Sequence, residues 1–262
     1  MNAAASSAAS EKPRTNRCLN IYGVVDRFFA LPGRTPSSDP IELELGTGGP
    51  VAAVYSWVDP AEFDDLEADV SEDGRLAKLA RRHDAVVRAL ASRGAVLPVR
   101  LGTLCSDATS LMELLEETAD DLVGELDRVR GCHEWDFRIQ AVLQSATGPA
   151  SAPRDESGTA YLMRRRDQRQ RAAAAQAEVS MAMCAADETL TALAESVTEL
   201  AVDASAMAMS HGYLVRTQLA TEFELVAAEL ANELERHGCN VRLSGPLPPY
   251  SFVKIRLERL SR

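Results

Sequence analysis

A long stretch from Thr159 to Ser196 contains no glycine or proline, and it constrains the fold more than any other part of the chain. It includes the run Ala172–Ala175 of the strongest helix former. The pattern predicts either one long helix or a helical hairpin that breaks near Asp187. Arginines concentrate near its start and could recognise phosphate or an acidic partner, or form a solvated helix face: Arg164, Arg165, Arg166, Arg169 and Arg171.

The composition agrees with a helix-rich protein. Hydrophobic residues make up 46% of the 262 residues, but aromatic residues only 5%, so much of the apolar content is small side chains suited to close helix packing. The length suffices for one large domain or two smaller ones, each with its own core.

The charge argues against several classes of partner. With 28 Lys and Arg against 39 Asp and Glu, the formal charge is −11, which disfavours nucleic acid as a partner. No apolar run approaches the roughly 20 residues that span a bilayer, and residues 1–17 lack the apolar core of a signal peptide. We therefore expect no membrane partner, a flexible leader over 1–17 and a cytoplasmic protein.

The cysteines are odd in number, far apart and without CxxC spacing, so neither a disulfide framework nor a zinc site is indicated. We expect reduced and mostly buried thiols: Cys18, Cys105, Cys132, Cys184 and Cys239.

The first half alternates strand and helix patterns. We expect a buried strand over 18–25, two antiparallel strands within 41–58 joined around 46–49, a helix from Arg75 stopped by Gly94, and an edge strand around Pro98. A helical stretch over 106–131 should begin at Ser106 or Asp107 and stop at Gly131, before a strand from 134 closes this half.

The Gly- and Pro-containing segment 146–158 is the expected linker between two domains, 18–145 and 159–262. After the long helical stretch we expect strands over 199–203 and 207–217, a helix over 218–237 ended by Gly238, and two last strands, NVRLSG and YSFVKIRL. Both halves interleave strands with helices, which predicts the α+β class.

Single candidate sites have plain structural alternatives. His83 lies in the apolar stripe of its helix and could act as a base, but no nucleophile or carboxylate is tied to it by a recognised spacing, so a hydrogen-bonded structural role is expected. Met207, Met209 and His211 would share a strand face and could hold Cu(I), whereas the alternative is core packing.

Tyr55 and Trp57 would also share a strand face and could stack RNA bases, but no basic cluster flanks them. Five carboxylates are spread over the polar side of one helix, with no sign of the unlike environments that acid/base catalysis needs: Glu113, Glu116, Glu117, Asp120 and Asp121. The sequence therefore predicts no enzyme, no catalytic residue, no cofactor and no metal.

The run from Arg81 to Leu104 resembles a hallmark of the gas vesicle GvpL/GvpF family, in which an arginine-histidine pair leads into a Leu-Pro-aliphatic-Arg-aromatic-Gly-Thr motif. Leu101 stands where the family has phenylalanine, which keeps the position apolar. The matching residues are His83, Leu97, Pro98, Arg100, Gly102 and Thr103.

Other segments are similar in the same order, so the resemblance spans about residues 18 to 257. LNIYGVV resembles the first strand of the family, and GPLPPYSFV its closing motif, with Leu247 in place of tryptophan. The remaining motif residues, which we expect to be structural, are Glu134 and Trp135, Tyr161, and Gly245, Pro246, Pro248, Pro249, Tyr250 and Phe252.

The resemblance implies a modified ferredoxin-like N-terminal domain and a C-terminal α+β domain with a long coiled-coil-like helical element. It also implies an accessory or minor structural protein of gas vesicles that binds the hydrophobic shell protein GvpA and possible further accessory proteins. The alternative from the residues alone is a metal-handling or RNA-binding regulatory module with a ferredoxin-like fold.

Overall fold

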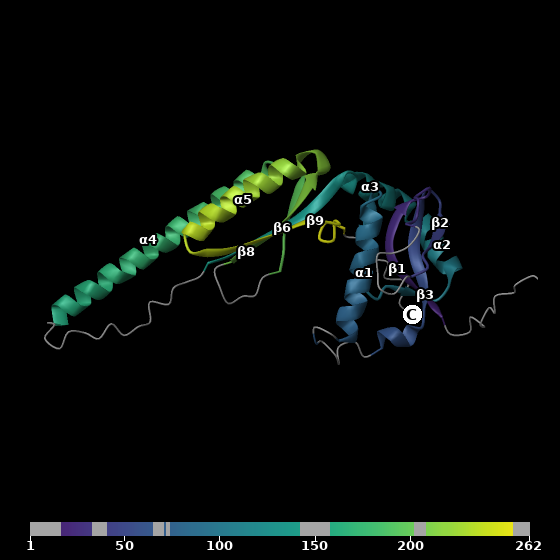
Figure 1. Ribbon diagram of the computed structural model, residues 1–262, viewed down its shortest axis with the longest axis horizontal. Helices are drawn as coiled ribbons and strands as arrows, with labels where there is room; N and C mark the ends of the chain where they lie inside the picture. The colour runs from purple at the N-terminus through teal and green to yellow at the C-terminus, as the bar shows by residue number, and fades with distance from the viewer. Residues whose placement is uncertain are drawn as a thin grey trace, which may run out of the picture. The chain divides into compact units, whose positions relative to one another are not determined.

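The computed structural model describes residues 17–32, 41–64, 71, 74–141, 158–201 and 208–253. The chain divides between Leu126 and Asp127 into two compact units, called unit 1 and unit 2 below (Figure 1). The leader up to residue 16 and the expected linker up to residue 157 lie outside the described residues.

Unit 1 is built on an antiparallel sheet with the strand order β2-β3-β1-β4, and β5 also pairs with β1. The first strand and the antiparallel pair within 41–58 are as expected, and β4, which contains Pro98, is an edge strand as expected. The strands are β1 (Cys18–Asp26), β2 (Glu44–Gly48), β3 (Val51–Val58), β4 (Val96–Pro98) and β5 (Leu104–Cys105).

The turn between β2 and β3 lies later than expected, because Gly46 and Thr47 are paired with β3. The chain reverses at Gly49, whose φ of +60° is a conformation that glycine adopts without a steric penalty.

Helices cover both faces of this sheet (Figure 1). Helix α1 (Arg75–Ala91) contacts β1 and β4, whereas α2 (Ala108–Glu117) contacts β2 and β3. Because both faces are covered, eight consecutive residues of β1 are buried. A short 3-10 helix, η1 (Pro60–Phe63), precedes α1. The strands and α1 follow the ferredoxin-like order, without a helix between β1 and β2 in the described residues.

Two details of the helices differ from the expectations. The φ of Gly94 is not positive. Glycine instead leaves room for the ring of Phe29, because a Cβ added at position 94 would lie 3.2 Å from that ring. The stretch 106–131 is broken at Thr118 into α2 and α3 (Ala119–Val129). Asp107 caps the first of these by accepting the N–H of Ser110, and Gly131 ends the second with a φ of +68°.

Unit 2 contains a second antiparallel sheet in the order β7-β8-β6-β9. The assignment of the strand after residue 131 to the first half is wrong, because β6 pairs with β8 and β9 along its length. The position of β6 along the chain suggested that it belongs to the first half, but its partners β8 and β9 both follow much later in the sequence. The strands are β6 (Cys132–Ala141), β7 (Ser196–Glu199), β8 (Ala208–Arg216) and β9 (Cys239–Leu247).

Helix α4 (Gly158–Thr191) is continuous, so the hairpin expected near Asp187 does not form. Its last turns and α5 (Ala220–Arg236) pack on one face of the sheet, and a 3-10 turn, η3 (Thr217–Leu219), leads into α5 (Figure 1). Gly238 ends α5 with a φ of +79°. The core includes alternate residues of β6, namely Trp135, Phe137, Ile139 and Ala141.

The segment after β9 is a pair of turns, so the last strand expected from Tyr250 is wrong over the described residues. The N–H of Tyr250 donates to Pro248 O, and the N–H of Phe252 donates to Pro249 O. These short-range hydrogen bonds are those of turns and not of a strand. Of the helices in the described residues, none has the length and hydropathy to cross a bilayer.

Candidate functional site

His83 is buried in unit 1, with 6% of its surface exposed, and its Nε2 lies 3.0 Å from the carbonyl oxygen of Val99. The ring also contacts Tyr22, whose hydroxyl is 3.0 Å from that of Ser56. Burial lowers the pKa of His83, which favours the neutral imidazole. This arrangement links α1 to the segment after β4.

The rest of the motif after Leu97 is a turn that returns the chain to β1. Leu97 and Pro98 are buried, and Thr103 donates both its N–H and its hydroxyl to Arg100 O. Gly102 has a φ of +80°. The N–H of Ile21 then donates to Thr103 O. The motif is explained by backbone geometry, without a reactive group.

Glu134 is a buried carboxylate of unit 2, with only 2% of its surface exposed. Its carboxylate accepts the backbone N–H of Ser251 at 2.8 Å. Burial, with a smaller contribution from Asp136, raises the pKa of Glu134 to about 7 even though the bond from Ser251 favours ionisation. The first and last motifs of unit 2 therefore meet at this carboxylate.

Trp135 makes a second junction between the same motifs. A Cβ added at Gly245 would lie 3.0 Å from Cγ of the indole and closer still to Cε3, so only glycine fits. The peptide bond between Gly245 and Pro246 is cis. Pro248 and Pro249 are buried beyond it.

Phe252 fixes the end of this turn. Its ring is buried, and its carbonyl oxygen accepts a hydrogen bond from Nη2 of Arg128 at 2.5 Å. Tyr250 is half-buried. The closing motif is thus a packed turn held by Glu134, Trp135 and Arg128, and none of these contacts presents an activated nucleophile.

His211 lies on β8, and its ring is engaged by a carboxylate of α4. Its Nδ1 is 2.6 Å from the Oδ1 of Asp187, and the same oxygen accepts the hydroxyl proton of Tyr213 at 2.6 Å. Met207 lies outside the described residues, and Met209 is partly buried against the core. No cluster of three His, Cys, Asp or Glu side chains suited to a metal occurs in the part of the chain that is described.

Tyr55 cannot serve as an open stacking platform, because its ring is buried and its hydroxyl donates to Glu44. Trp57 packs edge-on against it, with ring centroids 6.2 Å apart. The two aromatic residues therefore form a packed pair and do not offer two parallel free faces to RNA.

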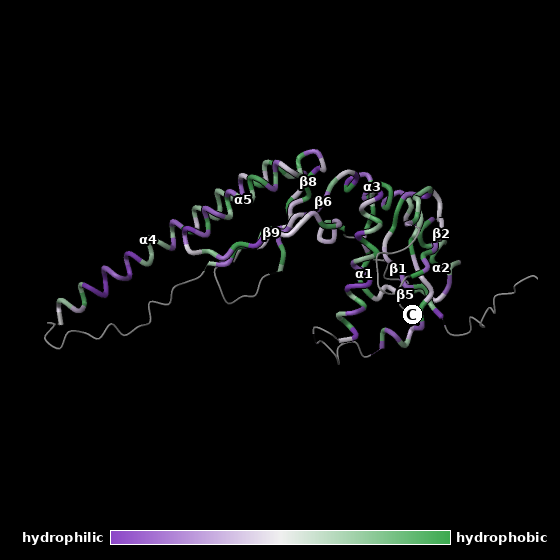
Figure 2. Tube along the Cα trace, in the orientation of Figure 1, coloured by the Kyte–Doolittle hydropathy of each residue, from purple (hydrophilic) through white to green (hydrophobic). Residues whose placement is uncertain are grey.

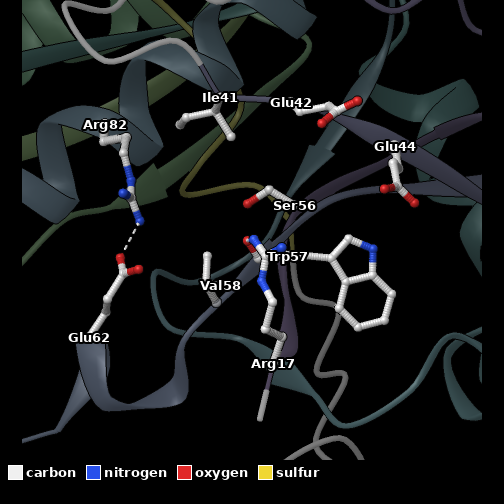
Figure 3. A pocket seen from close by; sticks show the side chains of 9 residues that line it. All are labelled: Arg17, Ile41, Glu42, Glu44, Ser56, Trp57, Val58, Glu62 and Arg82. Atoms are coloured by element: carbon white, nitrogen blue, oxygen red, sulfur yellow. Dashed lines mark hydrogen bonds and ion pairs between the residues drawn. The ribbon is translucent and has the colours of Figure 1, made fainter. Parts of the chain in front are cut away.

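A polar cavity of about 340 Å³ lies beside Trp57 (Figure 3). Arg82 and Glu62 form an ion pair of 3.1 Å across it, and Nη2 of Arg17 donates to Trp57 O at 2.6 Å. The other lining residues are Ile41, Glu42, Glu44, Ser56 and Val58. The cavity combines both charge signs and contains no paired nucleophile and base.

Phe28 is the most exposed of the large apolar side chains in the described residues, at 92%. The turn that carries it is fixed from both sides: Phe29 N–H donates to Asp26 O, and Arg27 donates its N–H to Pro50 O and Nη1 to Gly49 O. The guanidinium of Arg27 lies 5.7 Å from the centre of the Phe28 ring. We call residues 26–29 the Phe28 turn.

The arginine-rich part of α4 is largely exposed to solvent. Its residues are mostly hydrophilic (Figure 2). Tyr161 is 40% exposed, with Arg164 over its ring at 5.8 Å and Nη1 of Arg165 3.2 Å from its hydroxyl oxygen. This motif residue is therefore part of a surface.

Sequence reasoning missed the residues that join the motifs. Val99 and Ser251 act through their backbone, which leaves no compositional signal. The sequence patterns marked Asp187 only as a place where the long helix could break, and they did not single out Phe28. Their roles follow from tertiary contacts and exposure, which no local pattern encodes.

Comparison with known proteins gives a consistent result. Residues 19–254 match the model of the family described as gas vesicle synthesis protein GvpL/GvpF. Gas vesicle protein L of Streptomyces sp. (strain CB03234) is 32% identical over 260 residues, which cover 93% of this chain and 96% of that protein. Gas vesicle protein F of the same strain is 28% identical over 202 residues, with 72% and 83% covered.

The fold is similar to two crystal structures. GvpF from Anabaena sp. PCC7120 has a TM-score of 0.68 at 13% identity, with 92% of this chain and 98% of that chain covered. GvpF from Microcystis aeruginosa has a TM-score of 0.62 at 14% identity, with 91% and 99% covered. Because these sequence identities are low, the similarity to the two crystal structures concerns the fold alone.

Proposed function

This chain belongs to the GvpL/GvpF family of gas vesicle synthesis proteins, and we propose that it is an accessory or minor structural protein that binds the shell protein GvpA during nucleation or growth of the vesicle. The observation that carries the proposal is the match to gas vesicle protein L over nearly the full length of both chains. A non-catalytic role fits the residues as well, because most of the family-motif residues pack within a unit, as His83, Trp135 and Phe252 do.

Charge and hydrophobicity make such a role physically sensible. A shell subunit that exposes apolar surface to gas aggregates readily before assembly. A partner with a formal charge of −11 can cover that surface, and its net charge then keeps the resulting complexes apart. The complex would therefore reach the growing vesicle without aggregating.

Within this proposal, the Phe28 turn of unit 1 is the contact for the apolar shell protein. Phe28 is exposed, whereas the backbone on either side of it is held by hydrogen bonds from Phe29 to Asp26 and from Arg27 to Gly49 and Pro50. A backbone held in this way loses little conformational entropy on binding, which favours Phe28 as an anchor residue.

Co-expression with GvpA followed by pull-down tests the proposed function. The tagged full chain should recover GvpA, and a related accessory protein of the same vesicle serves as the positive control. Failure of this chain to recover GvpA where the control does recover it would count decisively against the proposal.

A further inference from the structure

The first part of α4 is a helix without a covering surface in the described chain. From Thr159 to Glu178 every residue is exposed except Arg164, whereas Met183, Ala186 and Leu190 in the last turns are buried. The first part of α4 extends beyond α5 (Figure 1). Most helices in proteins gain their stability from packing one face on another element. This stretch packs no face within the described chain. The exposed part is therefore a candidate contact for a second molecule.

The charges of α4 are separated along its length. Residues 159–171 contain five arginines and Asp167, a net charge of +4 (5 − 1). Residues 172–177 contain no charged residue. Residues 178–191 contain Glu178, Asp187 and Glu188, a net charge of −3. One end of the helix is thus complementary to the other.

We propose that α4 pairs antiparallel with α4 of a second copy of this chain, with the two-fold axis passing between Ala174 and Ala175. This inference concerns self-association and does not depend on the proposed binding of GvpA. We infer that the partner of α4 is a second copy of the chain. The same helix provides both oppositely charged ends, and its uncharged centre suits a two-fold axis.

The proposed register brings opposite charges together on both sides of the axis. Arg171 lies three residues before Ala174 and Glu178 three residues after Ala175, so each arginine faces the glutamate of the other copy. Glu188 then faces Tyr161 of the other copy, one turn from Arg165. The contact is symmetric, and each charge pair occurs twice.

A continuous open face of α4 is available for this contact. Glu178, Met181, Ala185 and Glu188 follow one another at spacings of three and four residues, and all are exposed although the opposite side of these turns packs on the core. The same stripe continues backwards through Ala174 to Arg171. At the centre, methyl side chains allow the two helix axes to approach closely.

The charged groups of this face are not used within the described chain. Arg171, Glu178 and Glu188 make no ion pair or side-chain hydrogen bond to another described residue. Pairing between two copies would therefore add ion pairs without breaking existing ones.

Charge reversal tests the pairing. The full chain should sediment as a dimer of twice 28.3 kDa. Arg171→Glu and Glu178→Arg should each raise the dissociation constant at least about tenfold, because two attractive pairs become repulsive. The double variant R171E/E178R should restore the dimer. Arg169→Glu carries the same change of charge on the opposite side of the helix, and it should leave the dimer unchanged.

Cross-linking tests the orientation. Cys184 is exposed on α4, while the other four cysteines are buried. In the antiparallel pair the two copies of Cys184 are separated by roughly 28 Å along the axis, at 1.5 Å per residue. A short bis-maleimide should therefore cross-link Ala174→Cys in a Cys184→Ser background, and should not cross-link the native chain.

A monomer at all concentrations would overturn the proposal, as would a dimer that Arg169→Glu weakens as much as Arg171→Glu does. Cross-linking through the native Cys184 would indicate a parallel pair and contradict the antiparallel register. Circular dichroism of each variant checks that the helix itself is retained, so that loss of the dimer reports on the contact.

Discussion

The backbone N–H of Ser251 donates a hydrogen bond of 2.8 Å to the buried carboxylate of Glu134, and this contact joins two family motifs that are far apart in the sequence. Together with the indole of Trp135 against Gly245, it fixes the closing turn to β6. The first and last motifs of unit 2 are therefore packed against each other, whereas Tyr161 lies on the exposed part of α4.

Glu134 should make stability depend on pH. Its pKa is raised from 4.5 to about 7 in the folded state, so the stabilisation is complete below about 4.5 and is lost as the pH rises through 7. The loss should reach up to ~3 kcal/mol. The free energy of unfolding of the native chain, measured with urea between pH 5 and 8, should fall as the pH rises. Glu134→Gln should remove this dependence on pH. Glu229→Gln, at an exposed position on α5, should retain it.

The effect of His83 on folding stability should have the opposite dependence on pH. Its pKa is lowered by burial, so the stability contributed by the neutral ring is present above the unfolded value of 6.5 and is lost as the pH falls through the lower folded value. His83→Gln should flatten this acid-side loss, whereas His237→Gln at an exposed position should not. An unchanged acid slope in His83→Gln would assign the effect to other groups.

Gly245→Ala should destabilise the protein by about 1–3 kcal/mol, because the new Cβ would overlap the indole of Trp135. Gly124→Ala is the matched control. Gly124 lies in α3 with no atom within 4 Å of an added Cβ, so alanine there should stabilise by about 0.5–1 kcal/mol. Equal effects at the two positions, measured by thermal unfolding, would contradict the packing described for Gly245.

Phe252→Ala should lower the free energy of unfolding by about 3–5 kcal/mol, because the ring is buried. Tyr250→Ala should also destabilise, but less, since Tyr250 is half-buried. The matched control is Phe28→Ala, which removes an exposed ring and should change stability by less than about 0.5 kcal/mol. Comparable losses for Phe252 and Phe28 would show that the turn is not packed as described.

Much of the local structure could be predicted, because periodicity and glycine positions are local signals. Gly131 and Gly238 mark helix ends that both carry a positive φ, and β1 was recognisable as a buried strand. The partners of β6 could not be predicted, because pairing with β8 and β9 depends on contacts between distant residues. The break at Thr118 was missed for the same reason.

The motif residues could be located from the sequence, but their contacts could not. His83 was predicted to be hydrogen-bonded, yet its partner is a carbonyl oxygen that any residue would supply. The pKa of Glu134 depends on burial by a turn over a hundred residues away, which no spacing indicates. The family resemblance located the motifs, but it gave none of these contacts.

The most direct test of the proposed function is a co-expression pull-down of GvpA with Phe28 variants of the full chain. The native chain should recover GvpA, and Phe28→Glu should recover little. Leu225→Glu, a matched charge at another exposed apolar position on α5, should behave as the native chain does. Equal recovery by Phe28→Glu and the native chain would contradict the role of the Phe28 turn. If the native chain recovered no GvpA while a related accessory protein did, the account of shell-protein binding would itself be wrong.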